Sequence, residues 1–238
     1  MAMKINRPTV LVNAINKTCP ECLLIFTSTD LVYEGEHPPY YADVSTPPTG
    51  KTQYGVTKSA FEKDVLNLKN GVVFRLSNMI GPKYQYEKVG CKFLEFLTEK
   101  LGSRDYIGLF HDQVRSFVYV KDVAYLICKT IDMYLSTATP FDKQGIYNVG
   151  GPVGCSRVDL ARDLCAITST PFIVHDEKQE SFQPSSDGSW TVYNTSNSTV
   201  FIVPGMQNPR DVTMNSSRTE EIFDIKFKSM REAIAESI

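Results

Sequence analysis

The sequence contains no apolar stretch long enough to cross a membrane as a helix. Its hydrophobic runs fall well short of the roughly 18–20 residues that such a helix needs. The opening residues, M-A-M-K-I-N-R-P-T, lack the apolar core of a signal peptide. Neither internal repeats nor coiled-coil heptads occur. We therefore expect a cytoplasmic globular protein rather than a membrane-spanning, secreted, repeat or coiled-coil protein.

An excess of charge of one sign is also missing. The 238 residues carry a net charge of −2, so we expect neither nucleic acid nor an anionic membrane as a partner. Hydrophobic residues make up 42% of the chain and charged residues 22%, which is ordinary for a soluble globular protein. A chain of this length holds one large domain or one and a half small ones.

Cysteine and histidine spacings that are typical of metal sites are also rare in this sequence. Of the six cysteines, Cys19 and Cys22 form the single C-x-x-C pair, and no nearby histidine completes a tetrahedral site. We expect no metal site, and we favour two free thiols at the end of a helix, just before a strand. The alternative is a redox site or one half of a zinc site.

Hydrophobic periodicity predicts alternating helices and strands in the first third of the chain. Residues 4–18 and 53–69 have helical spacing, whereas 22–28 and 72–76 are apolar runs typical of buried strands. The order helix–strand–helix–strand predicts the second half of a doubly wound, Rossmann-type parallel sheet. We assign residues 1–82 to it.

Apolar spacing also predicts which face of each helix is buried. For the first helix we expect Val10, Leu11, Ala14 and Ile15 to face the core. For the second we expect Phe61, Val65 and Leu68 to do so. A later helix should bury Ala124, Ile127, Ile131 and Leu135.

The pattern of residues 83–238 predicts a second, small α/β region whose segments interleave with the sheet. Within it, residues 180–200 are polar and serine-rich, with Trp190 as a possible anchor, and they predict a flexible insertion. The proline-rich stretch 34–52 is long for a connection, which indicates a functional loop over a site.

Tyr54 and Lys58 are the first candidates for chemistry. They are four residues apart, so they share one face of the helix over 53–69. A neighbouring ammonium group should stabilise the phenolate and lower the pKa of Tyr54, which is an acid–base arrangement. The alternative is two ordinary solvated side chains. Ser28 and Thr29 end the preceding strand, where ligands bind in open α/β sheets.

Four motifs in order resemble the extended short-chain dehydrogenase/reductase family. They are S-T-D-L-V-Y with Y-G-V-T-K, R-L-S-N-M-I-G-P, D-Q-V-R-S-F-V-Y-V-K-D-V-A and P-R-D followed by N-S-S-R. The resemblance covers nearly the whole chain outside 180–200. It is strongest to the branch that contains dTDP-4-dehydrorhamnose reductase and the regulatory beta subunit of methionine adenosyltransferase.

The resemblance implies an NAD(P)H-dependent reductase of a nucleotide-linked sugar such as dTDP-4-dehydrorhamnose. Its catalytic triad would be Thr29, Tyr54 and Lys58. Tyr54 would donate the proton, Lys58 would lower the pKa of Tyr54 and hold the cofactor ribose, and Thr29 would hydrogen-bond the reacting oxygen. Ser28, Tyr54 and Lys58 would contact NADP or NAD. The family also implies that the two early helices pair in a homodimer.

The resemblance further implies that residues 83–238 form a substrate-binding region, and it suggests individual substrate contacts. Asp30 would touch the sugar or, equally, cap a turn. Arg115 and Arg210 would bind the substrate diphosphate, since planar guanidinium groups match phosphate oxygens, with surface salt bridges as the alternative. Asn78 would line the same pocket, or it would be a buried turn amide.

The glycine motif G-x-x-G-x-x-G, whose helix N-terminus binds a dinucleotide pyrophosphate, does not occur in this sequence. By resemblance, about the first hundred residues of the family are absent from it, so binding of NAD(P) by this chain is doubtful and we expect an inactive truncated form. A second hypothesis is a non-catalytic regulatory subunit with a methionine adenosyltransferase-like partner. A third is an inactive product that aggregates through an exposed sheet edge.

Overall fold

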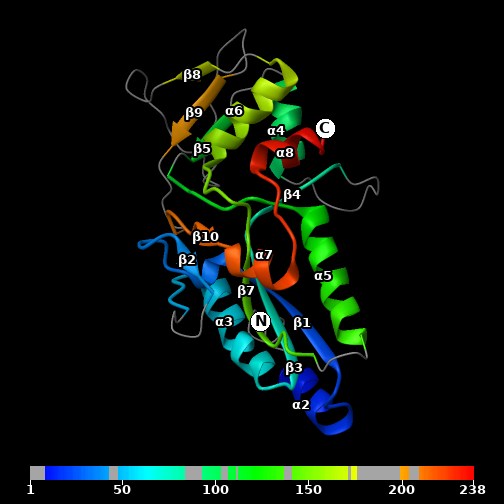
Figure 1. Ribbon diagram of the computed structural model, residues 1–238. Coiled ribbons are helices and arrows are strands. Elements are labelled where there is room, and N and C mark those ends of the chain that lie inside the picture. Colours follow the sequence, from blue (N-terminus) through cyan, green and yellow to red (C-terminus); the bar gives the residue numbers. More distant parts are fainter. Residues whose placement is uncertain are drawn as a thin grey trace.

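Figure 1 shows the computed structural model of the chain. It describes residues 9–42, 48–83, 93–102, 107–110, 112–136, 141–170, 173–175, 199–203 and 209–238. Of the expected insertion over 180–200, residues 180–198, including Trp190, lie outside the described residues. The remaining two, Thr199 and Val200, begin a strand.

Three parallel strands form the central sheet. They are β1 (Leu23–Thr29), β3 (Asn70–Leu76) and β7 (Gly145–Val149), in the order β1-β3-β7. Each is an apolar run of the kind expected for buried parallel strands. The half of a doubly wound sheet predicted from the sequence is therefore confirmed. The third strand, β7, comes from the later part of the chain, beyond residue 82.

Helices cover both faces of this sheet (Figure 1). On one face, α2 (Thr9–Thr18) and α3 (Gln53–Leu66) pack around Val73. On the other, α5 (Val120–Leu135) and α7 (Ser217–Phe223) pack around Val72 and Phe74, the neighbours of Val73 in β3. Successive side chains of a strand point to opposite faces, so the apolar residues of one strand pack into two cores, one on each face of the sheet.

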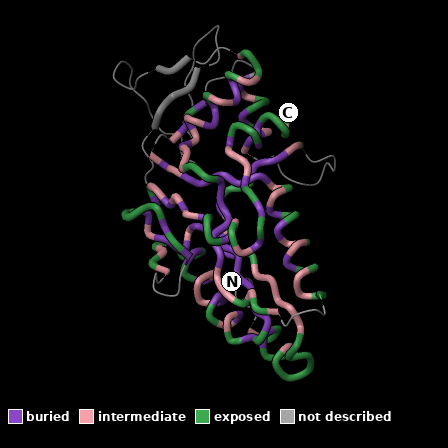
Figure 2. The backbone as a smooth tube through the Cα atoms, in the orientation of Figure 1, coloured by how far each residue is buried: buried purple, intermediate pink, exposed green. Residues whose placement is uncertain are grey.

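The second part of the molecule has its own core, to which three helices and one strand, Ile107–Phe110, of a smaller sheet contribute. The helices are α4 (Phe93–Gly102), α6 (Arg157–Thr168) and α8 (Met230–Ala235). The sheet is parallel, in the order β5-β9-β8, from β5 (Ile107–Phe110), β8 (Ile173–His175) and β9 (Thr199–Val203). Buried residues run through the middle of the molecule and join the two parts (Figure 2).

Two pairs of short parallel strands lie near the place where the two parts of the molecule meet. β2 (Tyr40–Tyr41) pairs with β10 (Met214–Asn215), and β4 (Met79–Ile80) pairs with β6 (Val118–Tyr119). A 3-10 turn, η1 (Asp30–Val32), follows β1 directly. The loop that leads from β1 to α3 is therefore fastened, through β2, to a segment near the C-terminus.

The buried face of α3 is the predicted one, since Phe61, Val65 and Leu68 are each at most 2% exposed. The helix ends earlier than predicted, at Leu66. Asn70 and Gly71, the two residues after the predicted helix, begin β3. A side chain at Gly71 would lie 2.0 Å from the carbonyl oxygen of Val65, so only glycine lets the strand start this close to the helix.

The predicted faces of two other helices are largely wrong. In α2, Val12 is buried in the core and Ile15 packs against the same core as predicted, but Val10 is 82% exposed and Leu11 and Ala14 are also exposed. In α5 the buried residues are Val123, Leu126 and Thr130. The expected face of α5 is largely at the surface, with Ala124, Ile131 and Leu135 exposed and Ile127 partly buried. Both helices carry apolar residues on more than one side, and packing against the sheet selects among them.

The cysteine prediction is also wrong. Cys19 and Cys22 form a disulfide, with their Cα atoms 5.6 Å apart, rather than two free thiols. The tight turn between α2 and β1 brings the two residues together, and the spacing lies within the range that a disulfide spans. The free cysteines among the described residues are Cys128, Cys155 and Cys165.

Over the described parts of the chain, no helix is both long and apolar enough to cross a membrane.

Candidate functional site

The candidate site lies where the carboxyl end of β1 meets the first turns of α3. Thr52 caps α3, its hydroxyl accepting a hydrogen bond from the Gly55 amide. A side chain at Gly55 would lie 2.0 Å from the carbonyl oxygen of Leu31, just beyond β1. Glycine therefore lets the helix pack directly on the segment that follows the strand. This close approach places Tyr54 and Lys58 beside the strand end.

Tyr54 and Lys58 lie together as their spacing predicts. The Lys58 Nζ donates a hydrogen bond to the carbonyl oxygen of Thr27 (2.9 Å) and lies 5.6 Å from the centre of the Tyr54 ring. The same ammonium is 4.7 Å from the centre of the Phe26 ring. Tyr54 is 43% exposed, so a ligand can reach part of this residue. A fixed cation and a partly accessible tyrosine therefore share one edge of the site.

The pKa of Tyr54 is raised above its ordinary value, opposite in direction to the lowering that we expected. Burial of the ring region is the larger cause, and the charge of Asp30 adds to it. The pKa of Lys58 is lowered by burial, against the opposing effect of Glu62. The phenol of Tyr54 is therefore held protonated, in the form that can donate a proton.

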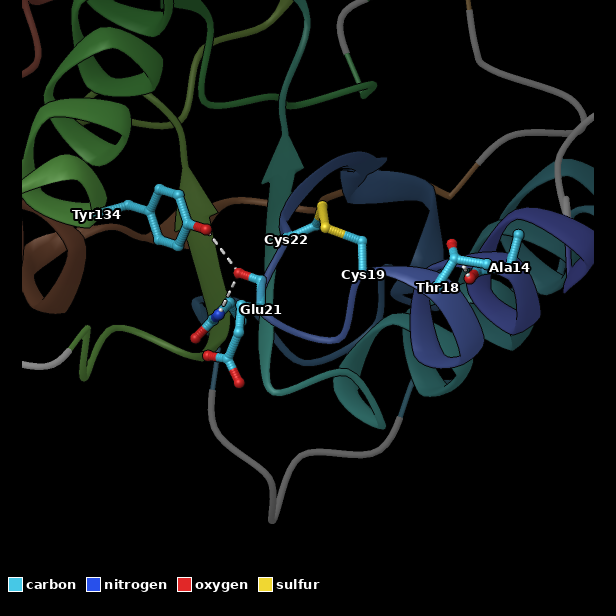
Figure 3. Close-up of a disulfide and its surroundings, with 7 residues drawn as sticks. Ala14, Thr18, Cys19, Glu21, Cys22 and Tyr134 are labelled. Atoms are coloured by element: carbon cyan, nitrogen blue, oxygen red, sulfur yellow. Dashed lines mark hydrogen bonds between the residues drawn. A yellow bond between two sulfur atoms is a disulfide. The ribbon is translucent and has the colours of Figure 1, made fainter.

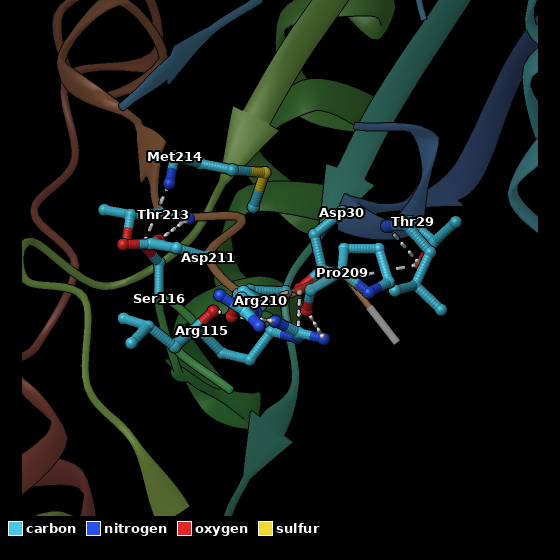
Figure 4. A network of polar contacts seen from close by, with 12 residues as sticks. Thr29, Asp30, Arg115, Ser116, Pro209, Arg210, Asp211, Thr213 and Met214 are labelled. Atoms are coloured by element: carbon cyan, nitrogen blue, oxygen red, sulfur yellow. Dashed lines mark hydrogen bonds and ion pairs between the residues drawn. The ribbon is translucent and has the colours of Figure 1, made fainter. Parts of the chain in front are cut away.

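Thr29 and Asp30 belong to a buried polar cluster (Figure 4). The Thr29 hydroxyl accepts a hydrogen bond from the Leu31 amide (3.2 Å) and donates one to Asp30 Oδ1 (3.3 Å). Ser77, just after β3, donates to Asp30 Oδ2 (3.1 Å). Burial, only partly offset by Arg115, raises the pKa of Asp30. The Thr29 hydroxyl thus stabilises the turn after β1 through these hydrogen bonds.

Arg115 holds two distant parts of the chain together. Its NH1 donates to the carbonyl oxygens of Val114 (2.8 Å) and Arg210 (3.3 Å), and its NH2 donates to that of Pro209 (3.1 Å). Its Nε lies 3.8 Å from Asp30 Oδ2, in a buried ion pair (Figure 4). The alternative of a surface salt bridge is therefore wrong. Its donors are directed at protein oxygens, and burial lowers its pKa.

Arg210 and Asn78 lie at the surface. Both side chains are exposed, which rules out the alternative of a buried turn amide for Asn78. The structure thus joins Thr29, Asp30 and Arg115 in one cluster and Tyr54 with Lys58 in another. The charge of Asp30 connects the two clusters, since it acts on the pKa of Tyr54.

A row of polar residues across the central sheet was not predicted. Ser28, Arg75 and Asn148 are register partners on β1, β3 and β7, and they lie on the sheet face that α3 covers. Glu62 of α3 accepts hydrogen bonds from Arg75 Nε (3.0 Å), Arg75 NH2 (2.7 Å) and the Ser28 hydroxyl (2.5 Å). Ser28, a cofactor candidate, is thereby engaged by Glu62 in this structure.

The row continues through Tyr33. Arg75 NH1 donates to the Tyr33 hydroxyl (2.9 Å), which donates to Asn148 Oδ1 (2.8 Å). Arg75 and Glu62 are each 1% exposed. One sequence signal pointed to this network: an arginine inside the apolar run V-V-F-R-L, since charged residues are almost never buried without partners. Because Glu62 lies one turn beyond Lys58, the network fixes the helix that carries the candidate acid.

Among the residues that the structure describes, no group of three or more histidine, cysteine, aspartate or glutamate side chains could hold a metal ion.

Comparison with known proteins gives a match over the whole sequence. A family model described as the RmlD substrate binding domain matches residues 1–238.

Individual relatives cover part of the chain. It is 33% identical over 165 residues to the mouse dTDP-D-glucose 4,6-dehydratase, covering 65% of this chain and 42% of the relative. It is 32% identical over 130 residues to the Xenopus tropicalis methionine adenosyltransferase 2 subunit beta, covering 54% and 36% respectively. The chain thus spans less than half the length of these relatives.

Solved structures share the fold. The crystal structure of dTDP-4-dehydrorhamnose reductase from Bacillus anthracis in complex with NADP matches with a TM-score of 0.64 and 22% identity. The match covers 90% of this chain and 64% of that one.

Proposed function

The chain belongs to the family of the RmlD substrate binding domain, and on this premise we propose that it is the substrate-binding and proton-donating part of an NAD(P)H-dependent reductase of nucleotide-linked sugars. The observation that carries the proposal is the exposed Tyr54 phenol beside the Lys58 ammonium at the end of β1. In this proposal residues 1–82 supply the cofactor side together with Asn78 as a substrate contact, and residues 83–238 supply the rest of the substrate side.

The residues present fit the nicotinamide end of such a cofactor. When bound, NAD(P)H supplies a hydride to the keto carbon of the sugar. Tyr54 donates its proton to the oxygen of that carbon, and its raised pKa keeps the proton in place until then. Lys58, fixed on the Thr27 carbonyl, holds the ribose and stabilises the phenolate that remains. Thr29 orients the turn that carries Asp30.

On the substrate side, Arg210 is the candidate for the diphosphate, because its side chain is exposed. Asn78 is exposed just beyond the carboxyl end of β3 and is a candidate to line the sugar pocket. Arg115 and Asp30 act indirectly. Their ion pair and the hydrogen bonds of Arg115 hold the Pro209–Arg210 backbone against the end of β1. Direct contact of Asp30 or Arg115 with the substrate would require this buried pair to open.

A second candidate function is that of a regulatory subunit. The identity to the frog methionine adenosyltransferase beta subunit supports it, as does the engagement of Thr29, Asp30 and Arg115 in internal contacts. A test is co-purification of this chain with a methionine adenosyltransferase catalytic subunit. Comparison of the wild type with Tyr54→Phe then separates the two functions, because partner binding should not need the phenol.

The first prediction is that this chain binds a nucleotide sugar but does not bind a dinucleotide. We expect dTDP-glucose to raise the thermal unfolding midpoint of the chain, and millimolar NADPH to leave it nearly unchanged. A ligand at about 100 times its Kd stabilises by roughly 2.7 kcal/mol. For a chain of this size each kcal/mol corresponds to about 2–4 °C, so real binding gives a shift of several degrees.

Two variants control this measurement. Arg210→Ala should reduce the shift caused by dTDP-glucose, while Lys58→Ala should not. A shift of several degrees with NADPH that disappears in Lys58→Ala would show that this chain binds the dinucleotide unaided, against our expectation. Absence of any shift with dTDP-glucose would count against the substrate-binding role itself.

Self-association is the second expected result. Val10 and Leu11 of α2 and Val56 of α3 are 82%, 46% and 46% exposed, and α2 packs beside α3. Pairing of these helices between two copies would cover apolar surface that is otherwise in water. We expect a dimer by light scattering at tens of micromolar protein. The change Val10→Glu should shift it toward monomer, whereas Lys17→Glu, also on α2, should not. A monomeric wild type would contradict the pairing.

A further inference from the structure

The disulfide between Cys19 and Cys22 lies in an accessible turn. Cys19, Pro20 and Glu21 are exposed and Cys22 is half-buried, between the end of α2 and the start of β1 (Figure 3). Thiol–disulfide exchange requires a thiolate to reach one of the two sulfur atoms. The exposed Cys19 offers that approach, and it lies outside the machinery described above.

The backbone of this turn does not depend on the sulfur–sulfur bond. The Cys22 amide donates to the Cys19 carbonyl (2.9 Å). The Glu21 carbonyl accepts from Asn70 Nδ2 (2.7 Å) and from the Tyr134 hydroxyl, which reach it from β3 and α5 (Figure 3). Opening the bond would therefore leave the turn in place, with both sulfur atoms near enough to close again.

The bridge also closes a very short loop, since the two cysteines are three positions apart. A disulfide restricts the unfolded chain less when the loop it closes is shorter. The fold consequently gains little from this bond as a clamp. Accessibility, a preformed turn and a small structural contribution together favour a bond that opens and closes in the folded protein.

We propose that Cys19 and Cys22 form a reversible redox site that exchanges with glutathione or a protein dithiol. A reductant thiolate attacks Cys19 Sγ, the Cys19–Cys22 bond breaks, and Cys22 leaves as a thiolate that takes a proton from water. A second reductant thiolate attacks the mixed disulfide at the reductant's own sulfur, which releases Cys19. The protein disulfide gains two electrons and two protons, and two reductant thiols become one disulfide.

The site stands apart from the proposed reductase chemistry. Cys22 directly precedes β1 and Thr29 ends it, so the two lie at opposite ends of one seven-residue strand. At about 3.3 Å per residue the strand separates them by roughly 20 Å. Its test is therefore independent of whether the chain binds a nucleotide sugar.

The experiment uses the folded wild-type chain in glutathione buffers of graded ratio, followed by alkylation with N-ethylmaleimide and peptide mapping. We expect Cys19 and Cys22 to change together from unlabelled in oxidised glutathione to fully labelled in reduced glutathione, and to return on reoxidation. Cys128, which is exposed and unpaired with another cysteine, should be available in the reduced buffer regardless of the pair. Circular dichroism should stay the same throughout.

Two variants complete the test. Cys22→Ser should leave Cys19 unable to form the internal bond, so that it becomes labelled or carries glutathione. Cys128→Ser should not alter the response of the pair. Labelling only after urea unfolding would show a static bond, and labelling in every buffer would show that the bond does not form. Either result overturns the proposal.

Discussion

Replacing Glu62 by alanine is expected to lower the free energy of unfolding by about 3–5 kcal/mol, because removing one partner of a buried ion pair leaves an uncompensated charge. Arg75 is 1% exposed, and its main partner is Glu62 (Arg75 NH2 to Glu62 Oε2, 2.7 Å). Although burial acts against the charge, the hydrogen bonds that Arg75 donates to Glu62 keep the pKa of Arg75 above its ordinary value. At 2–4 °C per kcal/mol, the unfolding midpoint should fall by roughly 6–20 °C.

A surface ion pair provides the control. Glu21 and Lys69 form a salt bridge of 2.6 Å, but their side chains are 66% and 63% exposed. Glu21→Ala should therefore cost about 1 kcal/mol or less. The double change Glu62→Leu with Arg75→Met should regain most of the loss, since apolar residues of similar volume replace buried pairs well. Equal effects of Glu62→Ala and Glu21→Ala would contradict the importance of the buried pair.

The sheet could be predicted because β1 and β3 carry apolar runs, L-L-I-F and V-V-F, whose residues pack into the cores on both faces of the sheet. The runs predicted at 22–28 and 72–76 correspond to β1 at Leu23–Thr29 and β3 at Asn70–Leu76. Such a strand is apolar at nearly every position, so it stands out against its polar flanks. The ends differ from the prediction by one or two residues, and β3 begins early because the Gly71 backbone can approach α3 closely.

The faces of the outer helices could not be predicted in the same way. In α2, Val10, Leu11 and Val12 are consecutive, so they point to three directions and sequence spacing does not select one. Packing against Phe61 and Val65 of α3 selects Val12. The identity of the buried face therefore depends on the neighbouring helix, which no local pattern encodes.

In the candidate site too, one part could be predicted from local spacing and another part depends on the fold. The meeting of Tyr54 and Lys58 follows from helical spacing alone. The direction of the Tyr54 pKa does not, because it depends on burial and on Asp30, which the fold brings near from the turn after β1. Similarly, Arg115 was assigned to a phosphate by residue type, but the fold turns its guanidinium to backbone oxygens 94 and 95 residues away.

The change Tyr54→Phe is expected to reduce turnover by about 10²–10⁴-fold in a form of this protein that reduces a nucleotide sugar, since a positioned general acid contributes that much. The phenylalanine ring keeps the packing and the distance to Lys58 Nζ, and only the proton donor is lost. Because the pKa of Tyr54 is raised, wild-type turnover should persist through neutral pH. It should fall only as the pH rises through a value above the tyrosine norm of about 10, where the phenol loses its proton.

Tyr125→Phe is the matched control, because Tyr125 is 59% exposed on α5, outside the site, and the chemical change is the same. It should leave turnover and its pH profile unchanged. Lys58→Ala should lower both turnover and cofactor affinity, whereas Tyr54→Phe should lower turnover alone, because the ammonium and not the phenol is assigned to the ribose. Full turnover in Tyr54→Phe would remove Tyr54 as the proton donor. A fall in wild-type turnover well below the ordinary tyrosine pKa would instead show that a bound cofactor reverses the direction of the Tyr54 pKa.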